Sequence, residues 1–464
     1  MKAESRSNDC PRCHELERRV AELETLVRSL SDQVAKLSAA LEEERRRGKR
    51  QAAPFSKGPP AAEPKPPGRK SGKRHGPHAH RSIPPRIDET YDAPLPESCP
   101  DCASGRISES HVAVQYQTEI PRTVIYRSFD VHVGCCEGCG RMIEGRHALQ
   151  TSSARGAAAS QLGPQVHALL ALLNKELGLS HGKSVQLLRT LFPELRIARA
   201  TSVRSTLRTA ERCAAAYERL RSDLRGAREV APDETGWRVG GRLTWLHAFV
   251  SPRETCYVID PTRSHEPAER LLGLDWSGTL VHDGWSVYDR FTEAAHQQCL
   301  AHLRRRCQEL LETAARGAVR LPRAVLVLVD RAFALRRAWR GHRLSGDALA
   351  EQGLLLGCEL DRLASGRFTH APNGRLARHL QKHALHWFWF LIDPTIQATN
   401  HWAERAIRPA VVNRKVWGGN RTWAGARAQG ILMSVIRTCP QRAYAPFAFL
   451  LDAHCQPEPQ LIPV

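Results

Sequence analysis

The sequence predicts a multidomain protein. A coiled coil, a small β domain built on cysteines and a helical domain precede an α/β domain that a helical insertion interrupts. Three observations support this prediction. Leucine and valine recur with a seven-residue period near the amino end, two Cys-x-x-Cys pairs follow a basic stretch, and the second half contains strand-like apolar runs that end in aspartates. A chain of 464 residues has room for several domains.

The amino-terminal heptad pattern predicts a coiled-coil dimerisation helix over residues 1–44. Apolar residues fill both seams, at Leu16, Leu23, Leu30 and Leu37 and at Val20, Val27, Val34 and Leu41. Valine at one seam and leucine at the other favours a parallel two-stranded coiled coil, so we expect a homo-oligomer. The alternative is a single amphipathic helix on the protein's own body, which four uninterrupted heptads disfavour.

Positive charge is concentrated in residues 45–88, which we expect to be a disordered basic linker. The chain has a net charge of +20 and a pI of about 9.8, and residues 45–86 hold thirteen Lys and Arg against one acid. This uneven distribution indicates a polyanionic partner. The linker residues that are candidates for contact with DNA phosphates are Arg69, Lys70, Lys73 and Arg74. The alternative is a tether that only adds solubility.

Two cysteine pairs predict a zinc ribbon over residues 89–150. Cys99 and Cys102 form the first pair, and Cys136 and Cys139 form the second after 33 intervening residues of strand-like sequence. Four thiolates make one closed, structural Zn²⁺ site. Fourteen cysteines, with no signal peptide and no apolar run of about 20 residues, indicate reduced thiols in a cytoplasmic protein without membrane contact.

Residues 160–225 are predicted to be helical. Leucine-rich stretches are separated by Gly178-Leu179-Ser180, where Ser180 is expected to cap the following helix. Short helices of this kind form either a helix-turn-helix that binds a DNA major groove or a plain bundle that joins two domains. The sequence does not separate these alternatives.

Residues 226–440 are predicted to form the α/β domain, with a helical insertion at 304–392 and a tail at 441–464. Asp233 and Asp283 each follow a short apolar run that is typical of a strand, and two further strand-like runs lie between them. Strands arranged in this way bring both carboxylates to one edge of a sheet.

A third acid, Glu404, lies at the start of a predicted helix far downstream. Three converging carboxylates supply the hard oxygen ligands that Mg²⁺ or Mn²⁺ prefers, and two such ions form a phosphoryl-transfer site. Taken singly, each acid, like its neighbours Glu234 and Asp289, is more typical of a solvated turn. The assignment therefore depends on the joint pattern.

These blocks resemble the catalytic blocks of the IS66-family transposases, which belong to the DDE group and have an RNase H-like fold. The matching stretches are Val230–Trp237 (VAPDETGW), Thr279–Tyr288 (TLVHDGWSVY) and Thr399–Pro409 (TNHWAERAIRP). The resemblance covers nearly the whole chain, because these transposases also carry a glycine- and lysine-rich motif and a zinc-binding domain at the corresponding positions.

The resemblance implies a role for each block. Asp233, Asp283 and Glu404 match the catalytic triad that binds two Mg²⁺ or Mn²⁺ ions. Cys299 and His302 match a Cys-x-x-His signature of these transposases, and we expect a structural or positioning role for them. The candidate DNA contacts on the helix of the third acid are Arg408, Arg414 and Lys415.

The implied function is that of a DNA transposase of a bacterial insertion sequence. It would bind double-stranded element ends and target DNA, act in the nucleoid with companion proteins of the same element, and catalyse metal-dependent strand cleavage and strand transfer. Two alternatives are a DNA-binding regulator with an inactive RNase H-like domain and a nuclease that cuts without joining. The presence of all three acids disfavours the first, and the residues do not distinguish the second.

Overall fold

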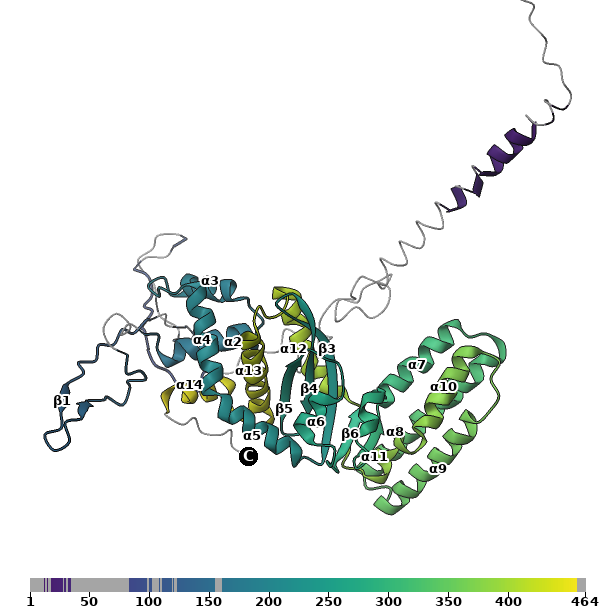
Figure 1. Cartoon of the computed structure of the whole chain (residues 1–464). Helices are drawn as coiled ribbons and strands as arrows, with labels where there is room; N and C mark the ends of the chain where they lie inside the picture. The colour runs from purple at the N-terminus through teal and green to yellow at the C-terminus, as the bar shows by residue number, and fades with distance from the viewer. Residues whose placement is uncertain are drawn as a thin grey trace, which may run out of the picture. The chain divides into compact units, whose positions relative to one another are not determined.

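The chain divides into two units, Met1–Ser82 and Ile83–Val464, and the computed structural model describes most of the second (Figure 1). The described residues are 12, 15, 18–27, 29, 30, 32–34, 83–97, 100, 101, 108, 111–118, 120, 123–154 and 161–456. The predicted DNA contacts of the basic linker, and the first cysteine pair of the predicted zinc ribbon, lie outside these residues. Of the helices that are described, none is long and apolar enough to cross a membrane.

The described residues of the first unit are helical. Their apolar side chains face solvent: Val20, Leu23, Val27, Leu30 and Val34 are 50 to 61% exposed. An apolar stripe of this kind on a single helix favours association with another helix. The parallel coiled coil stays a prediction.

The second unit begins with a small hairpin that carries the second cysteine pair. Strands β1 (Val133–Cys135) and β2 (Met142–Glu144) pair antiparallel, with Cys135 opposite Met142. At the tip, the N–H of Gly140 donates to the carbonyl of Cys136 at 2.8 Å, and Gly140 has a φ of 68° that favours glycine. Cys136 and Cys139 therefore lie in one tight turn.

The predicted helical region forms a bundle together with the last two described helices of the chain. Its helices are α2 (Pro164–Lys175), α3 (His181–Leu191), α4 (Arg199–Arg212), α5 (Ala214–Arg225), α13 (Trp423–Gln441) and α14 (Pro446–Cys455). Ser180 caps α3 by accepting from the N–H of Lys183. Phe449 and Leu450 of α14 are buried in a common core with α2, α4 and α13. Helix α14, which lies within the segment 441–464 expected to be a tail, is thus part of this core.

A five-stranded mixed sheet follows α5 in sequence. The strand order is β5-β4-β3-β6-β7. The strands are β3 (Glu229–Val239), β4 (Arg242–Val250), β5 (Thr255–Asp260), β6 (Thr279–His282) and β7 (Ala295–Gln298). β3, β4 and β5 pair antiparallel, whereas β6 pairs parallel with both β3 and β7. β3 is therefore the centre of the sheet.

Helices protect both faces and one edge of this sheet. α12 (His401–Trp417) packs on one face, and α6 (Glu266–Leu272) packs on the other. α13 covers the free edge of β5, where the hydroxyls of Ser434 and Thr438 accept hydrogen bonds from the backbone N–H groups of Tyr257 and Thr255. These bonds satisfy an edge that would otherwise be open to pairing with another chain.

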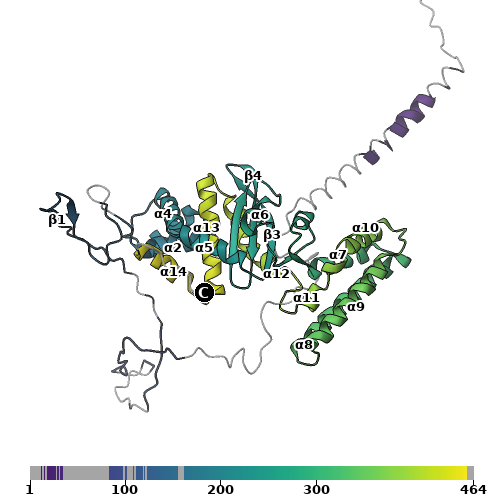
Figure 2. The same cartoon turned by 60° about the horizontal axis from the view of Figure 1, so that its bottom comes forward.

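The helical insertion leaves the sheet after β7 and returns before α12 (Figures 1 and 2). It comprises α7 (Leu300–Thr313), α8 (Arg320–Arg340), α9 (Gly346–Ala364), α10 (Ala371–Lys382) and α11 (Trp389–Ile392). Buried leucines, Trp387 and Phe390 form a core within it. Its first helix begins at Leu300, four residues before the predicted boundary of 304.

A buried lysine in α2 has no carboxylate partner among the described residues. Lys175 is 4% exposed, its Nζ donates to Oε1 of Gln429 at 2.6 Å, and it lies 5.5 Å from the Trp417 ring. Burial lowers the pKa of Lys175 to about 7. The folded state therefore loses stability as the pH falls from the ordinary lysine pKa of 10.5 towards 7.

We therefore expect Lys175→Met to stabilise the protein at neutral pH. Removing the desolvated ammonium should raise the free energy of unfolding by on the order of 1–2 kcal/mol at pH 7, after the loss of the Gln429 hydrogen bond. The gain should shrink towards pH 10.5. Thermal unfolding at both pH values measures it, with the exposed Lys183→Met as the control. An equal loss of stability at both pH values would contradict this account.

Candidate active site

Two of the predicted acids lie side by side at the centre of the sheet. Asp233 is in β3, and Asp283 directly follows β6. The parallel register sets Glu229 opposite Thr279 and Val230 opposite Leu280. Continuing it by three residues places Asp233 beside Asp283.

Strand periodicity places Asp233 on the face of the sheet that α12 covers. Successive side chains of a strand point to opposite faces, so residues two apart share one. Ala231 and Val281 are buried in the core that the sheet forms with α12. Asp233, two residues further along β3, therefore faces α12. Asp283 lies one residue beyond the end of β6, and its charge acts on Asp233. Glu404 lies in the first turn of that helix.

The electrostatics show that Asp233 senses the other two acids. Burial raises the pKa of Asp233 most, the negative charges of Glu234, Asp283 and Glu404 also raise it, and a hydrogen bond from the N–H of Glu234 lowers it; together they bring it to about 7. Asp283 is exposed, and its Oδ1 accepts from the N–H of Trp285 at 3.0 Å. A nearby cation would favour the charged form of Asp233 and lower its pKa.

The third acid is held by the first helix of the insertion. Oε1 of Glu404 lies 3.6 Å from Nε2 of His302 and 3.7 Å from an Nη of Arg305. His302 and Arg305 are three residues apart on α7, so they share one face of that helix. Both of these contacts to Glu404 thus come from the insertion.

Cys299 connects the three segments that carry these residues. Its backbone N–H donates to the carbonyl of His282 at 2.7 Å, and its Sγ accepts from the N–H of Asn400 at 3.4 Å. It is 2% exposed, and burial raises the pKa of its thiol. A buried, protonated thiol is a poor nucleophile, and these contacts are those of a residue that fixes backbone positions.

The donor set fits hard divalent cations. Asp233, Asp283 and Glu404 offer oxygen ligands, and a cation would relieve the raised pKa of Asp233. Across the described part of the chain, however, no group of three or more His, Cys, Asp or Glu side chains is close enough to hold a metal ion. Glu404 contacts His302 and Arg305 in this arrangement.

A second polar cluster lies beside the aspartates, and sequence reasoning missed it. Glu234 points to the face opposite Asp233, where Nε and Nη2 of Arg263 donate to its Oε1 at 3.0 and 2.7 Å. The Arg263 guanidinium also lies 4.2 Å from the centre of the Trp285 ring, and Tyr288 donates to Glu234 at 3.3 Å. This cluster ties β3 to the loop after Asp283. The two-residue period of β3 could have indicated that Glu234 lies on the face opposite Asp233.

The insertion also contacts this loop through buried histidines. Gly284 has a φ of 89°. A Cβ there would lie 2.8 Å from the side chain of Gln298 in β7 and 2.8 Å from the side chain of His379 in α10. The buried or half-buried histidines gathered behind the loop are His282, His296, His379, His383 and His386. Burial lowers the pKa of every one of them, so they are neutral at pH 7.

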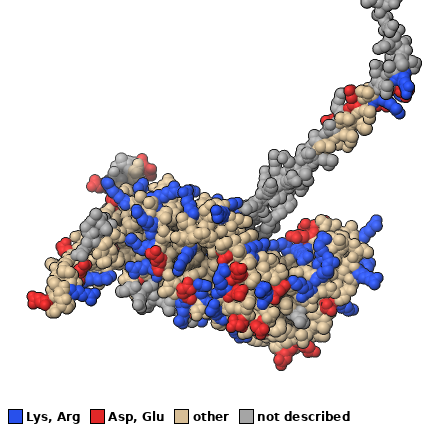
Figure 3. Space-filling model, in the orientation of Figure 1, with Lys and Arg blue, Asp and Glu red and all other residues tan. Residues whose placement is uncertain are grey.

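The predicted DNA contacts on α12 differ in accessibility. Arg408 and Lys415 are exposed. Arg414 is half-buried and donates to the hydroxyl of Thr235 and to the carbonyl of Gly236, so its guanidinium is engaged with β3. On the face shown in Figure 3, Lys and Arg side chains gather over α7 and α10.

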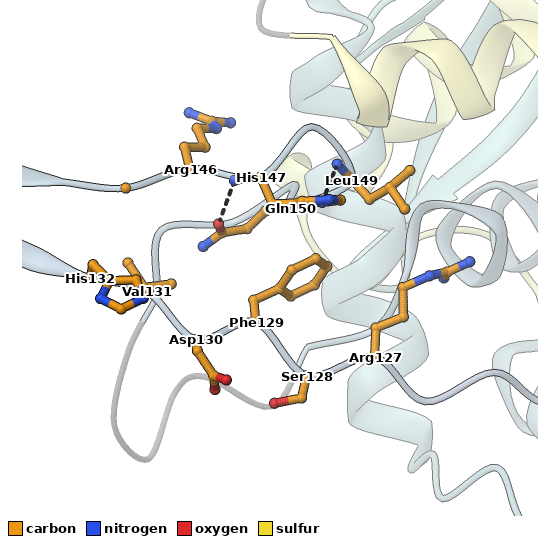
Figure 4. Close-up of a pocket in the computed structure, with 11 residues that line it drawn as sticks. Arg127, Ser128, Phe129, Asp130, Val131, His132, Arg146, His147, Leu149 and Gln150 are labelled. Carbon is orange, nitrogen blue, oxygen red and sulfur yellow. Dashed lines mark hydrogen bonds between the residues drawn. The ribbon is translucent and has the colours of Figure 1, made fainter.

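The cysteine hairpin lies apart from the acids in sequence and in the fold. Backbone N–H groups of Cys139 and Gly138 lower the pKa of the Cys136 thiol, which favours a thiolate. A hollow beside the hairpin is lined by residues 127–132 and by residues 145–150 except Ala148 (Figure 4). None of the three acids lines it.

Comparison with known proteins gives one family. The model described as "Transposase IS66 family" matches residues 159–428, more than half of the 464 residues. The match includes the helical bundle up to the first turns of α13, the sheet, the insertion and α12, and hence all three acids with Cys299 and His302. No match was found among curated proteins.

The raised pKa of Asp233 predicts that this residue destabilises the protein in the absence of a cation. Because the pKa in the folded state, about 7, exceeds the ordinary value of 3.8, stability is lost as the pH rises between these values. At pH 8, the free energy of unfolding of Asp233→Asn should therefore exceed that of wild type by on the order of 1–3 kcal/mol, and its unfolding temperature should be higher. Near pH 4, the two proteins should be about equally stable.

The matched control is Asp260→Asn, which breaks the ion pair with Arg270 and should lower stability at pH 8. Adding Mg²⁺ at pH 8 should stabilise wild type and leave Asp233→Asn unchanged. A lower unfolding temperature for Asp233→Asn without metal would show that Asp233 is not under electrostatic strain.

Proposed function

Because the chain belongs to the IS66 family of transposases, we propose that it is a DDE transposase in which Asp233, Asp283 and Glu404 are the catalytic acids. It would cut DNA at the ends of an insertion sequence and join those ends to target DNA. The single observation that best supports the assignment is the position of both aspartates in neighbouring segments at the centre of one sheet, with Glu404 in the first turn of the helix that packs on that sheet.

The sheet supports an RNase H-like fold for the catalytic domain, residues 226–440. Three antiparallel strands, β5-β4-β3, continue into β6 and β7, which run parallel to β3. The insertion separates the second acid from the third in sequence, and its return to α12 brings Glu404 back to the sheet.

The three acids and the residues that contact them can be given roles in phosphodiester chemistry. Two Mg²⁺ or Mn²⁺ ions, when held by the three acids, would activate the attacking oxygen and stabilise charge on the phosphate. Asp233 and Asp283 offer carboxylates from adjacent strands, so their separation is set by the sheet. His302 and Arg305 orient Glu404, and the Glu234–Arg263 pair orients the loop of Asp283.

The remaining segments would bind DNA and assemble the protein. We assign a parallel coiled coil to residues 1–44, because the described apolar seam is exposed. The cysteine turn of the β1–β2 hairpin supports a zinc ribbon over 89–150 with one structural Zn²⁺. The linker 45–88 would add phosphate contacts, and the bundle 160–225 is either a helix-turn-helix or a connector. Companion proteins of the element and a place in the nucleoid are part of the same proposal.

The catalytic proposal predicts the effect of three conservative substitutions. Asp233→Asn, Asp283→Asn and Glu404→Gln should each reduce Mg²⁺-dependent strand cleavage by at least about 100-fold, because each replaces a metal-binding carboxylate with a neutral amide. DNA binding should persist in all three variants. Asp289→Asn is the matched control: it lies in the same loop and pairs with Lys382 at 2.6 Å. Near wild-type cleavage by any one of the three variants would exclude that residue as a ligand.

Joining separates the proposed transposase from a nuclease. With a supplied 3′-OH end and Mg²⁺, wild-type protein should form joined product, and the three variants should not. Cleavage without joined product favours the nuclease, and DNA binding without cleavage favours a regulator.

The zinc proposal predicts the metal content of the full chain. Wild-type protein should hold one equivalent of Zn²⁺, and Cys99→Ser/Cys102→Ser should lose it, because two thiolates cannot close a tetrahedral site. Cys135→Ser, which alters the exposed neighbour of Cys136, should keep its zinc. Elemental analysis after dialysis measures each content. Full zinc retention in the double variant would exclude the ribbon.

A further inference from the structure

The tip of the β3–β4 hairpin and the loop between α12 and α13 form one continuous structure. The N–H of Gly240 donates to the carbonyl of Asn420, and the N–H of Asn420 donates to the carbonyl of Arg238, both at 2.9 Å. Nε1 of Trp237 donates to Oδ1 of Asn420 at 2.8 Å. Gly419 has a φ of 119°, and a Cβ there would lie 2.4 Å from the Arg238 carbonyl, so the close approach requires glycine.

The contact joins two stretches that lack acidic residues. No Asp or Glu occurs from Thr235 to Arg253, nor from Arg405 to Arg442. The exposed cations at the junction are Arg238, Arg242, Lys415, Arg421 and Arg427. Trp423 is 51% exposed and lies four residues from Arg427, on the same face of α13. We call these six residues the basic tip.

Two elements lead from the catalytic acids to the basic tip. Asp233 senses the charge of Glu404, Gly236 accepts from Arg414, and Val239 pairs with Asn420. β3 and α12 therefore run side by side in the same direction. Six strand residues separate Asp233 from Val239, a distance of about 20 Å, or about six base pairs of duplex.

We propose that the basic tip binds the phosphate backbone of the duplex on one side of the cleavage site, about six base pairs from the catalytic acids. This inference rests on the proposed function and adds a DNA-binding surface to it. The five cations neutralise phosphates, and Trp423 packs against a sugar or base edge. Contacts of this kind set the register of the DNA on the protein without reading its sequence.

Salt dependence tests the proposal. The full chain carrying Arg238→Gln/Arg242→Gln, or Arg421→Gln/Arg427→Gln, is titrated with a random-sequence 40-base-pair duplex at several salt concentrations. Each double variant should bind about 3- to 10-fold more weakly at low salt. The magnitude of the slope of log affinity against log salt should fall by up to about 1.8, about 0.9 for each phosphate that the variant no longer neutralises. Trp423→Ala should weaken binding without changing the slope.

The matched control is Arg219→Gln/Arg221→Gln on α5, where the arginines pair with Asp223 and Glu218. It removes the same charge and should leave affinity and slope unchanged. Unfolding temperatures of all variants are compared with wild type. The corresponding Lys variants keep the charge and should keep the wild-type slope, so a reduced slope confined to the Gln variants is an effect of charge.

Substrate length tests the position. Two cleavage substrates are each trimmed to fewer than about five base pairs, one on the left and the other on the right of the cut. One of the two should lack the duplex that the basic tip binds, and on that substrate the difference between wild type and the basic-tip variants should disappear. Affinity and slope equal to those of the α5 control would overturn the proposal. So would loss of binding to polyglutamate with unchanged DNA binding, because the surface would then serve an acidic protein. Equal cleavage by Asp233→Asn and wild type would instead refute the catalytic proposal and leave the salt result valid.

Discussion

The hydrogen bonds around Cys299 hold together the parts on which the candidate site depends. The N–H of Cys299 donates to the carbonyl of His282 at the end of β6, and its Sγ accepts from the N–H of Asn400 at the start of α12. The N–H of the next residue, Leu300, donates to the carbonyl of Ala398 at 3.0 Å. The insertion leaves and returns at this point. Closing a long loop costs only slightly more entropy than closing a short one, and the insertion has its own buried core. A large insertion is therefore compatible with a fixed position for Glu404.

The insertion begins and ends at this junction, and its helices also contact residues of the candidate site. His302 and Arg305 reach Glu404 from α7, His379 packs against Gly284 from α10, and Lys382 bonds to Asp289. Exposed pairs such as Lys382–Asp289 contribute little stability singly. The tight packing at Gly284 restricts the backbone more strongly, because that residue has a left-handed conformation and no room for a side chain. The insertion thus positions both the second and the third acid.

Local patterns predicted the elements of the site, and long-range contacts determined the rest. The apolar runs before Asp233 and Asp283 indicated strands, and the structure has strands there. Period-two alternation also separates Asp233 from Glu234, which a sequence reader can apply once the strand is assigned. Nothing local indicates that Arg414 bonds to β3 or that Phe449 packs against α2 and α4, because each contact joins segments far apart in sequence. The acid-free stretches were visible in the sequence, but their junction at Asn420 was not.

The charge order along α12 satisfies the helix and the proposed function together. A helix stabilises negative charge in its first turn and positive charge in its last turn, and α12 has Glu404 in the first and Arg414 and Lys415 in the last. Eleven residues of helix separate Glu404 from Lys415, about 16 Å at about 1.5 Å per residue. Because β3 runs alongside, Asp233 and Glu404 are connected to the basic tip through one pair of packed elements, β3 and α12. DNA bound at the tip would then be held at a set distance from the acids, without any contribution from the linker.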